Sequence, residues 1–543
     1  MSLNWAITRR TSEYEPVNKE ERKHIEIYDT TLRDGCQAEG ISMSLEDKLC
    51  IAEALDDLGI DYIEGGYPLS NPKDAEFFKH LDGLNLEVSR VAAFGSTRRA
   101  HKKAEDDKGL NALLKTEVPA VTLVAKTWDL HVQKVLKTEL DENLRMIEDS
   151  VEWMKQQDRE VLLDAEHFFD GYRANPEYAL KVVRVAAEAG ADCVVLCDTN
   201  GGSLTTEVAD LTRKVCDNID APVGIHCHDD SGLAVANSVS AVQNGAVHVQ
   251  GTLNGFGERC GNADICTIIP IINHKTPYRC ITAEREKRLT EVSRLTYEVA
   301  NQMFRSNQPF VGPSAFAHKG GLHVDAMRKD RATYEHIDPA AVGNERRFLI
   351  GELSGRASLL EKIEKFDIAH DRELSTRLLQ RLQELENQGY QFEAAEGSFE
   401  LMVKKETGNY RKFFDTEGYH VSIIRNTEGK LVTDASVKLD VGGERVHTAS
   451  EGDGPVNALD GALRKALEKH YPALRQVHLT DYKVRVINPR AATAAKVRVI
   501  LQSSDDGHVW GTVGVSENII EASWQALVDS IEYKLLMREE DSE

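Results

Sequence analysis

Between residues 25 and 275, short apolar, β-branched runs alternate eight times with longer helical segments, and this repeat most constrains the fold. A polar or glycine-rich turn follows each apolar run. The runs are Ile25–Asp29, Tyr62–Gly66, Val88–Phe94, Val121–Ala125, Val161–Glu166, Cys193–Asp198, Val223–His228 and His248–Leu253. Strands that alternate with helices pair in parallel through right-handed crossovers. Eight such units in about 250 residues predict a (β/α)8 TIM barrel.

The segments between these runs are amphipathic and are expected to be helices. They include Leu45–Leu58, Leu140–Gln157, Pro176–Ala189, Thr205–Ile219 and Leu233–Asn244. A doubly wound sheet is the alternative architecture for this alternation. It usually has fewer units, and no G-x-G-x-x-G turn follows the first strand, so a dinucleotide site is weakly supported.

The pattern changes after residue 290, which indicates further domains. The 543 residues exceed the roughly 250–300 at which single cores stop growing. We place the barrel at 22–285 and a helical linker subdomain at 286–390. From the end of the barrel onward we expect one helix at Ala283–Met303, a Gly/His-rich loop at Gly312–His323, and helices near Leu353–Phe366 and Asp371–Asn387.

The C-terminal part, 391–543, is strand-rich and repeats itself. Val437–Leu467 and Val497–Leu536 each read as strand, turn, strand and helix; the second turn is at Asp505–Gly507. Two βββα-like halves predict a small pseudo-symmetric α/β domain.

Composition limits the partners and the compartment. The net charge of −23 argues against nucleic acid or an anionic membrane, because both need a positive patch. No apolar stretch approaches the roughly 18 residues of a membrane span, and the polar N-terminus lacks a signal peptide's apolar core. Nine cysteines, an odd number in a large chain, are expected to be reduced thiols of a cytoplasmic protein.

Candidate metal ligands follow the first and seventh strands, at the barrel face where TIM-barrel chemistry occurs. Arg33 and Asp34 come after the first strand; alone, they are also explained by a solvated turn with a local ion pair. His226 and His228 share one face of the seventh strand, since residues i and i+2 point the same way. Barrel closure brings the first strand near the seventh, so two imidazoles and a carboxylate could chelate one divalent ion.

Other polar side chains lie at the same rim. Asp164 and Glu166 share a face of the fifth strand, where they form either a structural hydrogen-bond network or a general base. Thr199 follows the sixth strand and could donate to a carboxylate. On the eighth strand four polar residues share one face: His248, Gln250, Thr252 and Asn254.

Three motifs in order carry a family resemblance. They are Asp29–Gly35 (Asp-Thr-Thr-Leu-Arg-Asp-Gly), His226-x-His228-x-Asp230 and Gly257–Asn262 (Gly-Glu-Arg-Cys-Gly-Asn). Together they resemble the 2-isopropylmalate, homocitrate and citramalate synthases. The resemblance extends through Asp164–Tyr172 and Leu353–Arg356 into the C-terminal domain, and so covers nearly the whole chain.

Within that family the chain is most similar to citramalate synthases of the longer type. The similar phrases are Glu64–Pro68, Ser70–Asp74, Phe94–Arg99 and Trp128–Val132. Cys36 and Asp229 depart from the family pattern, which affects fine specificity rather than reaction class.

The resemblance implies a condensation of acetyl-CoA with a 2-oxo acid, pyruvate, at a divalent metal (Mg, Mn or Zn). The implied metal ligands are Asp34, His226 and His228, with Asn262 near or in the shell. The implied substrate and catalytic residues are Arg33 and Thr199 at the 2-oxo acid, Glu166 as base and Glu258 in support. It further implies a homodimer in which His323 and Tyr334 complete the partner's site, and an amino-acid effector, isoleucine, at the C-terminal domain.

Several alternatives stay open. The acceptor could be 2-oxoisovalerate or 2-oxoglutarate instead of pyruvate, since one apolar group is worth only about 1–3 kcal/mol of discrimination. A lyase or carboxylase-type transferase of the same barrel group, and a non-catalytic regulatory barrel, are the other functional classes. The C-terminal domain could also be a dimerisation module alone.

Overall fold

The computed structural model describes residues 22–319, 323, 326–327, 329–348, 372–425, 429–487, 495–505 and 508–540. It divides into two compact units, Met1–Phe316 with His336–Arg346 and Ala317–Glu335 with Arg347–Glu543. The expected helix at Leu353–Phe366, the Leu353–Arg356 segment, and Asp506 and Gly507 of the expected turn lie outside the described residues.

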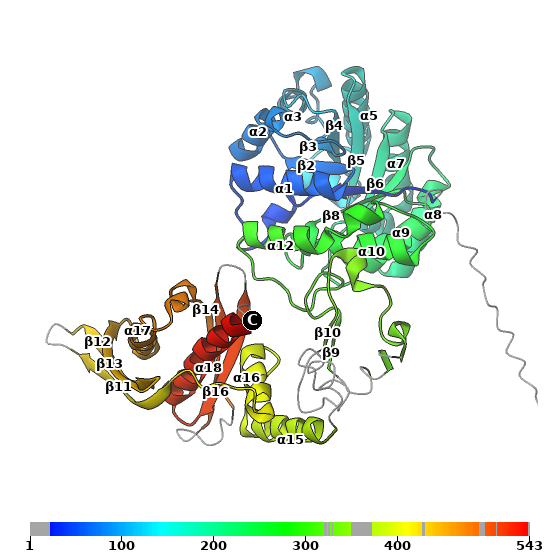
Figure 1. Ribbon diagram of the computed structural model, residues 1–543. Helices are drawn as coiled ribbons and strands as arrows, with labels where there is room; N and C mark the ends of the chain where they lie inside the picture. Colours follow the sequence, from blue (N-terminus) through cyan, green and yellow to red (C-terminus); the bar gives the residue numbers. More distant parts are fainter. Residues whose placement is uncertain are drawn as a thin grey trace, which may run out of the picture. The chain divides into compact units, whose positions relative to one another are not determined.

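The first unit is a closed barrel of eight parallel strands, which confirms the predicted TIM barrel (Figure 1). The strands are β1 (Glu26–Asp29), β2 (Tyr62–Gly66), β3 (Arg90–Ser96), β4 (Ala120–Lys126), β5 (Glu160–Glu166), β6 (Cys193–Asp198), β7 (Val223–Cys227) and β8 (His248–Gly251). Each pairs with the next, and β8 pairs with β1 from Glu26↔His248 to Asp29↔Gly251.

Helices surround this barrel and bury its outer face. They are α1 (Leu45–Leu58), α2 (Pro72–Lys79), α3 (Lys108–Leu114), α4 (Asp129–His131), α5 (Leu140–Gln156), α6 (Phe168–Ala174), α7 (Pro176–Glu188), α8 (Thr205–Cys216), α9 (Ala234–Gln243) and α10 (Ile265–Lys275). In α1 the Ser44 side chain caps the first turn and Gly59 ends the helix at φ 88°. The apolar helix faces and the outward strand residues form one continuous core.

The third strand begins two residues later than predicted. The Asp56 carboxylate accepts hydrogen bonds from the backbone N–H groups of Val88 (2.9 Å) and Ser89 (2.7 Å). These bonds hold the residues before Arg90 in a turn, where they cannot pair with β2.

The single helix expected at Ala283–Met303 was wrong. Two helices occupy this segment, α11 (Ala283–Glu286) and α12 (Leu289–Val299). Arg288 lies between them with ψ −4°, and Asn301 adopts a left-handed φ of 51° just after α12. A residue in that conformation ends a helix.

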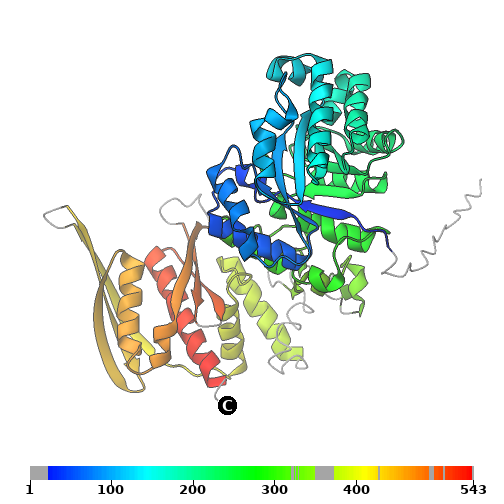
Figure 2. The same cartoon turned by 90° about the horizontal axis from the view of Figure 1, so that it is seen from above.

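The second unit contains two similar halves, each of three antiparallel strands and a helix. One half is β11 (Asp415–Arg425), β12 (Leu431–Val441), β13 (Glu444–Gly452) and α17 (Pro455–Leu467). The other is β14 (His478–Val486), β15 (Val497–Ser504), β16 (Val509–Ser516) and α18 (Ile519–Glu540). In Figure 2 the orange α17 and the red α18 each run along their own sheet, and their side chains share one core. The predicted repeat of two βββα halves is confirmed.

The rest of the second unit is smaller. It contains a two-stranded sheet of β9 (Ala317–His318) and β10 (Arg347–Phe348), and the helices α15 (Arg372–Gln388) and α16 (Glu396–Thr407). All nine cysteines are free thiols. Among the described residues, no helix has the length and apolar character needed to cross a membrane.

Candidate metal centre and active site

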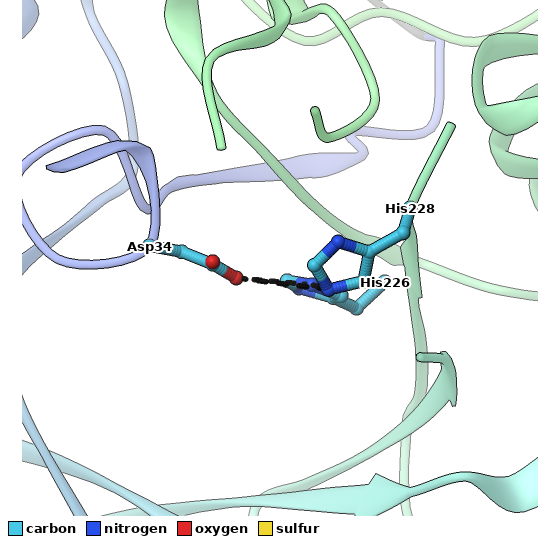
Figure 3. Close-up of side chains that lie close together, drawn as sticks. All are labelled: Asp34, His226 and His228. Carbon is cyan, nitrogen blue, oxygen red and sulfur yellow. Dashed lines mark hydrogen bonds and ion pairs between the residues drawn. The ribbon is translucent and has the colours of Figure 1, made fainter. Parts of the chain in front are cut away.

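Asp34, His226 and His228 meet at the C-terminal rim of the barrel (Figure 3). The Asp34 Oδ2 atom lies 3.4 Å from His226 Nε2 and 3.9 Å from His228 Nε2. The two Nε2 atoms are 3.4 Å apart, and all three side chains are buried. Three ligand atoms that converge within 4.8 Å of one another form a candidate site for one metal ion.

The backbone after β1 places Asp34. The chain turns tightly there, because the N–H groups of Asp34 and Gly35 both donate to the carbonyl of Thr30, at 2.9 and 3.0 Å. The buried Asp29 carboxylate fixes the start of the turn by accepting from Thr31 N–H (2.8 Å) and Thr31 Oγ1 (2.9 Å). Burial raises the pKa of Asp29 to about 7 despite these bonds.

The ligand group has a clear charge pattern. Burial opposes the ionised form of Asp34, but the charge of Arg33 and the hydrogen bond with His226 hold its pKa well below the ordinary value. Burial also disfavours a charged His226, yet the bond and charge of Asp34 outweigh it and raise that pKa. For His228, burial and the neighbouring His226 lower the pKa to about 4. The site therefore offers an ionised carboxylate and a neutral imidazole, which are the ligand forms that divalent cations bind.

Asn262, the fourth residue predicted for the metal shell, pairs through its backbone with one member of this group. It forms a β-bridge with His228, and its Nδ2 donates to the carbonyl of Phe256 at 3.0 Å. Its Oδ1 is buried and has no hydrogen-bond partner among the described residues. Gly257 makes this placement possible, since a Cβ there would lie 2.2 Å from Asn262 Nδ2. A buried oxygen without a partner, on a residue bridged to His228, fits a divalent metal, so the residues present suit the implied ion.

Arg33 is held beside the ligand group by residues of β2 and β3. Its Nε donates to Glu64 Oε2 at 2.6 Å, and its guanidinium stacks 3.8 Å above the Phe94 ring. Its Nη1 lies 3.4 Å from Asp34 Oδ2. Glu64 is fully buried and also accepts from the Tyr28 hydroxyl at 2.9 Å. Glu64 was not among the predicted site residues, although a carboxylate within an apolar strand was the signal for it.

A chain of two buried hydrogen bonds supports His226 from behind the ligand group. The Nδ1 atom of His226 lies 2.9 Å from Gln250 Oε1 on β8, and Gln250 Nε2 donates to Asp164 Oδ1 on β5 at 3.0 Å. Burial raises the pKa of Asp164 to about 6. Asp164 thus participates in the hydrogen-bond network that was one of its two interpretations.

The structure places Glu166 at the end of β5, where it forms an ion pair with Lys126 at the end of β4. Lys126 is a further residue that the sequence analysis missed. Thr199 is half-buried after β6, and its Oγ1 accepts from the backbone N–H of His167 at 2.9 Å. Its hydroxyl hydrogen is left to donate elsewhere.

Glu258 is exposed, and its carboxylate lies 3.6 Å from Arg259 Nη1 rather than against the buried ligand group. Arg259 binds Asp230 through two hydrogen bonds (2.7 and 2.9 Å) and donates to the carbonyl of Thr199 at 2.7 Å. It therefore joins the loops after β6, β7 and β8 around the rim.

His323 and Tyr334 lie in the second unit, where their rings stack with centroids 4.1 Å apart. Both side chains are exposed. The structure brings these two predicted residues together on a surface of their own unit.

A cavity of about 260 Å³ adjoins Arg33 and Phe94 between the loops after β1 and β2. Its lysines are already engaged, Lys48 with Asp74 (2.5 Å) and Lys73 with the carbonyl of Met43 (2.8 Å). A larger cavity of about 710 Å³ is lined by α2, α3 and their loops, and includes none of the site residues described above.

Comparison with known families agrees with this architecture. The model of the HMGL-like family matches residues 24–296, the homocitrate synthase post-HMGL domain-like family matches 310–390, and the LeuA allosteric (dimerisation) domain matches 393–535. The closed barrel with its rim of metal-type ligands is thus an HMGL-like barrel.

Similarity to individual proteins extends over nearly the whole chain. The (R)-citramalate synthase of Geobacter sulfurreducens is 52% identical over 519 residues, covering 95% of this chain and 98% of that protein. The (R)-citramalate synthase of Aquifex aeolicus is 53% identical with the same coverage. A probable 2-isopropylmalate synthase of Methanopyrus kandleri is 33% identical over 508 residues, covering 93% and 97%. The chain belongs to the citramalate synthase family.

Proposed function

We propose that this chain condenses acetyl-CoA with pyruvate to give (R)-citramalate and CoA, a step toward isoleucine and related branched-chain amino acids. The observation that carries the proposal is a complete Asp34–His226–His228 group in a chain 52–53% identical to (R)-citramalate synthases over 95% of its length. A non-catalytic regulatory barrel would not need to keep all of these ligand side chains buried and convergent.

The metal would be held by Asp34, His226, His228 and Asn262. A bound Mg, Mn or Zn ion supplies Lewis-acid polarisation of the acceptor's keto group. Arg33 adds a fixed positive charge next to this position, because Glu64 and Phe94 hold its guanidinium in place. Such charge stabilises the oxygen that becomes an alkoxide when the new bond forms.

The proton and bond changes can be assigned to residues of the chain. Glu166 takes a proton from the methyl group of acetyl-CoA, and the resulting enolate carbon attacks the keto carbon of pyruvate. Lys126 holds the Glu166 carboxylate at the rim while this occurs. The alkoxide takes up the proton that Glu166 received, which gives the hydroxyl group of the product and returns Glu166 to its ionised form. Water then cleaves the thioester, which releases CoA and leaves the second carboxylate of the product. Thr199 orients the pyruvate carboxylate, and Glu258 assists from the solvent side of the rim.

The remaining assignments concern assembly and regulation. We propose a division into a barrel (22–285), a linker subdomain (286–390) and a regulatory domain (391–543). A homodimer would let His323 and Tyr334 of one subunit complete the partner's site. The match to an allosteric (dimerisation) domain at 393–535 supports both dimerisation and an amino-acid effector, which we propose to be isoleucine.

A larger acceptor is the second candidate. A relative that is 33% identical to this chain is named a probable 2-isopropylmalate synthase. The acceptor for that reaction is 2-oxoisovalerate, which makes it the second candidate substrate. The higher identity to citramalate synthases favours pyruvate.

The test is a CoA-thiol release assay with acetyl-CoA and three acceptors in parallel: pyruvate, 2-oxoisovalerate and 2-oxoglutarate. We expect the highest kcat/KM with pyruvate. A higher kcat/KM with either larger acid overturns the substrate assignment, and no thiol release with any of the three overturns the reaction class.

A further inference from the structure

Gln250 is a fully buried side chain that connects one metal-type ligand to the opposite part of the barrel. In the sheet, Gln250 of β8 is the direct partner of His226 of β7, so both side chains point to the same side of the barrel wall. Its oxygen lies 2.9 Å from His226 Nδ1, and its nitrogen lies 3.0 Å from Asp164 Oδ1 on β5. This amide therefore spans the barrel interior between strands that are not neighbours.

The chemistry of the groups fixes the direction of each of these two hydrogen bonds. An ionised carboxylate only accepts, so the NH2 group of Gln250 must face Asp164. The amide oxygen then faces His226 and accepts from Nδ1–H. With its hydrogen on Nδ1, the ring presents Nε2 to Asp34 and His228, which lie 3.4 Å away on the open side.

The second imidazole has no comparable support. The Nδ1 atom of His228 is buried without a hydrogen-bond partner among the described residues. Of the two rings in the ligand group, only His226 is thus held from behind by a side chain whose own orientation is fixed.

We infer that Gln250, oriented by Asp164, is a positioning residue that sets the tautomer and ring orientation of His226 for cation binding. This inference rests on the metal site of the proposed function. Gln250 itself lies outside the three motifs that carry the family resemblance. Residues behind a metal-binding histidine typically affect metal affinity about 10- to 100-fold.

The test measures metal affinity directly in the full-length protein. Metal-stripped chain is titrated with Mn²⁺, and the Kd is read by calorimetry for wild type, Gln250→Met and Gln250→Glu. Gln250→Met preserves side-chain length but removes the acceptor, and we expect its Kd to be about 10- to 100-fold higher than that of wild type. Gln250→Glu keeps the acceptor for His226 Nδ1–H, and a proton shared between its second oxygen and Asp164 replaces the donated N–H, so we expect its Kd within about threefold of wild type.

The matched control is Asn237→Leu on α9. Asn237 is also buried; its Oδ1 accepts from Thr205 Oγ1 and its Nδ2 donates to the carbonyl of Ser203 (both 2.9 Å), and neither partner is a ligand residue. Its substitution should leave the Kd unchanged. Circular dichroism verifies folding, and if Gln250→Met does not fold, Gln250→Asn, whose shorter amide cannot reach His226, replaces it with the same expected loss.

Each outcome is decisive. If the wild type binds Mn²⁺ and the folded Met or Asn variant binds it with the same Kd, Gln250 does not position His226, while the metal site itself is supported. Equally weak binding by Gln250→Met and Gln250→Glu shows that the acceptor is not the cause and also overturns it. Failure of the wild type to bind Mn²⁺ overturns the metal site itself.

Discussion

Glu64→Gln tests how the barrel positions Arg33. The substitution keeps the shape of a side chain that is completely buried and accepts from Arg33 Nε at 2.6 Å and from Tyr28 at 2.9 Å. Every hydrogen bond can still be made. The new amide oxygen can accept from Arg33, and the Tyr28 hydroxyl can accept from the new NH2 while donating to Thr122 Oγ1, 2.7 Å away. Only the negative charge is lost.

The magnitude follows from that loss. Hydrogen bonds to charged groups contribute about 1.5–3 kcal/mol and neutral ones about 0.5–1.5, so we expect the free energy of unfolding to fall by about 1–2 kcal/mol. Asp34 is then the nearest carboxylate to the guanidinium, at 3.4 Å, and Arg33 is drawn toward a ligand of the metal group. We expect kcat/KM for pyruvate to drop about 10- to 100-fold, which is roughly 1.4–2.8 kcal/mol of transition-state stabilisation.

Two further variants sharpen this prediction. Glu64→Ala leaves the buried Arg33 charge without its main partner and should cost about 3–5 kcal/mol of stability in urea unfolding. Glu286→Gln is the control, because Glu286 is also buried and binds Asn273 (3.1 Å) and His274 (3.0 Å) outside the site. Its kcat/KM should equal that of wild type. If Glu64→Gln keeps wild-type kcat/KM, Glu64 does not position Arg33 for the reaction and the reasoning is refuted.

Three other predictions follow from the site and the family. Asp34→Ala and His226→Ala should each lower condensation more than 1000-fold and remove Mn²⁺ binding while the far-UV circular dichroism stays native; activity near wild type in either variant would exclude the metal site. Mixing inactive Glu166→Ala and His323→Ala proteins should restore part of the activity after subunit exchange, and no recovery despite demonstrated exchange would contradict a shared site. Isoleucine should inhibit the full chain and not an active form truncated near residue 390, with typical coupling of about 1–3 kcal/mol; calorimetry that detects no binding of isoleucine, leucine or valine would leave dimerisation as the role of 391–543.

The barrel was predictable because its signal is repeated and local. Two strands, Tyr62–Gly66 and Cys193–Asp198, have the predicted bounds, since each apolar run ends abruptly at a turn. The late start of the third strand shows that a distant side chain can decide a boundary. Asp56 on α1 holds Val88 and Ser89 out of β3, and no local pattern in the sequence records that contact.

The metal-type ligands of the site were also predictable, because their positions follow from the local strand pattern. Strand alternation places His226 and His228 on one face, and barrel closure brings Asp34 to them. Glu64 and Gln250 act through contacts with residues more than twenty positions away, so their partners emerge only from the folded barrel. A buried charge or amide on the inward face of an apolar strand was the available signal.

The product that the full-length chain forms from acetyl-CoA and pyruvate tests the reaction and its dependence on a metal together. Metal-stripped protein is assayed alone and after addition of Mn²⁺, and the product is resolved by chiral chromatography with mass detection. We expect (R)-citramalate in amounts equal to the CoA released, formed only after the metal is restored. Undiminished turnover by the metal-stripped protein, or no citramalate in the restored one, would contradict it.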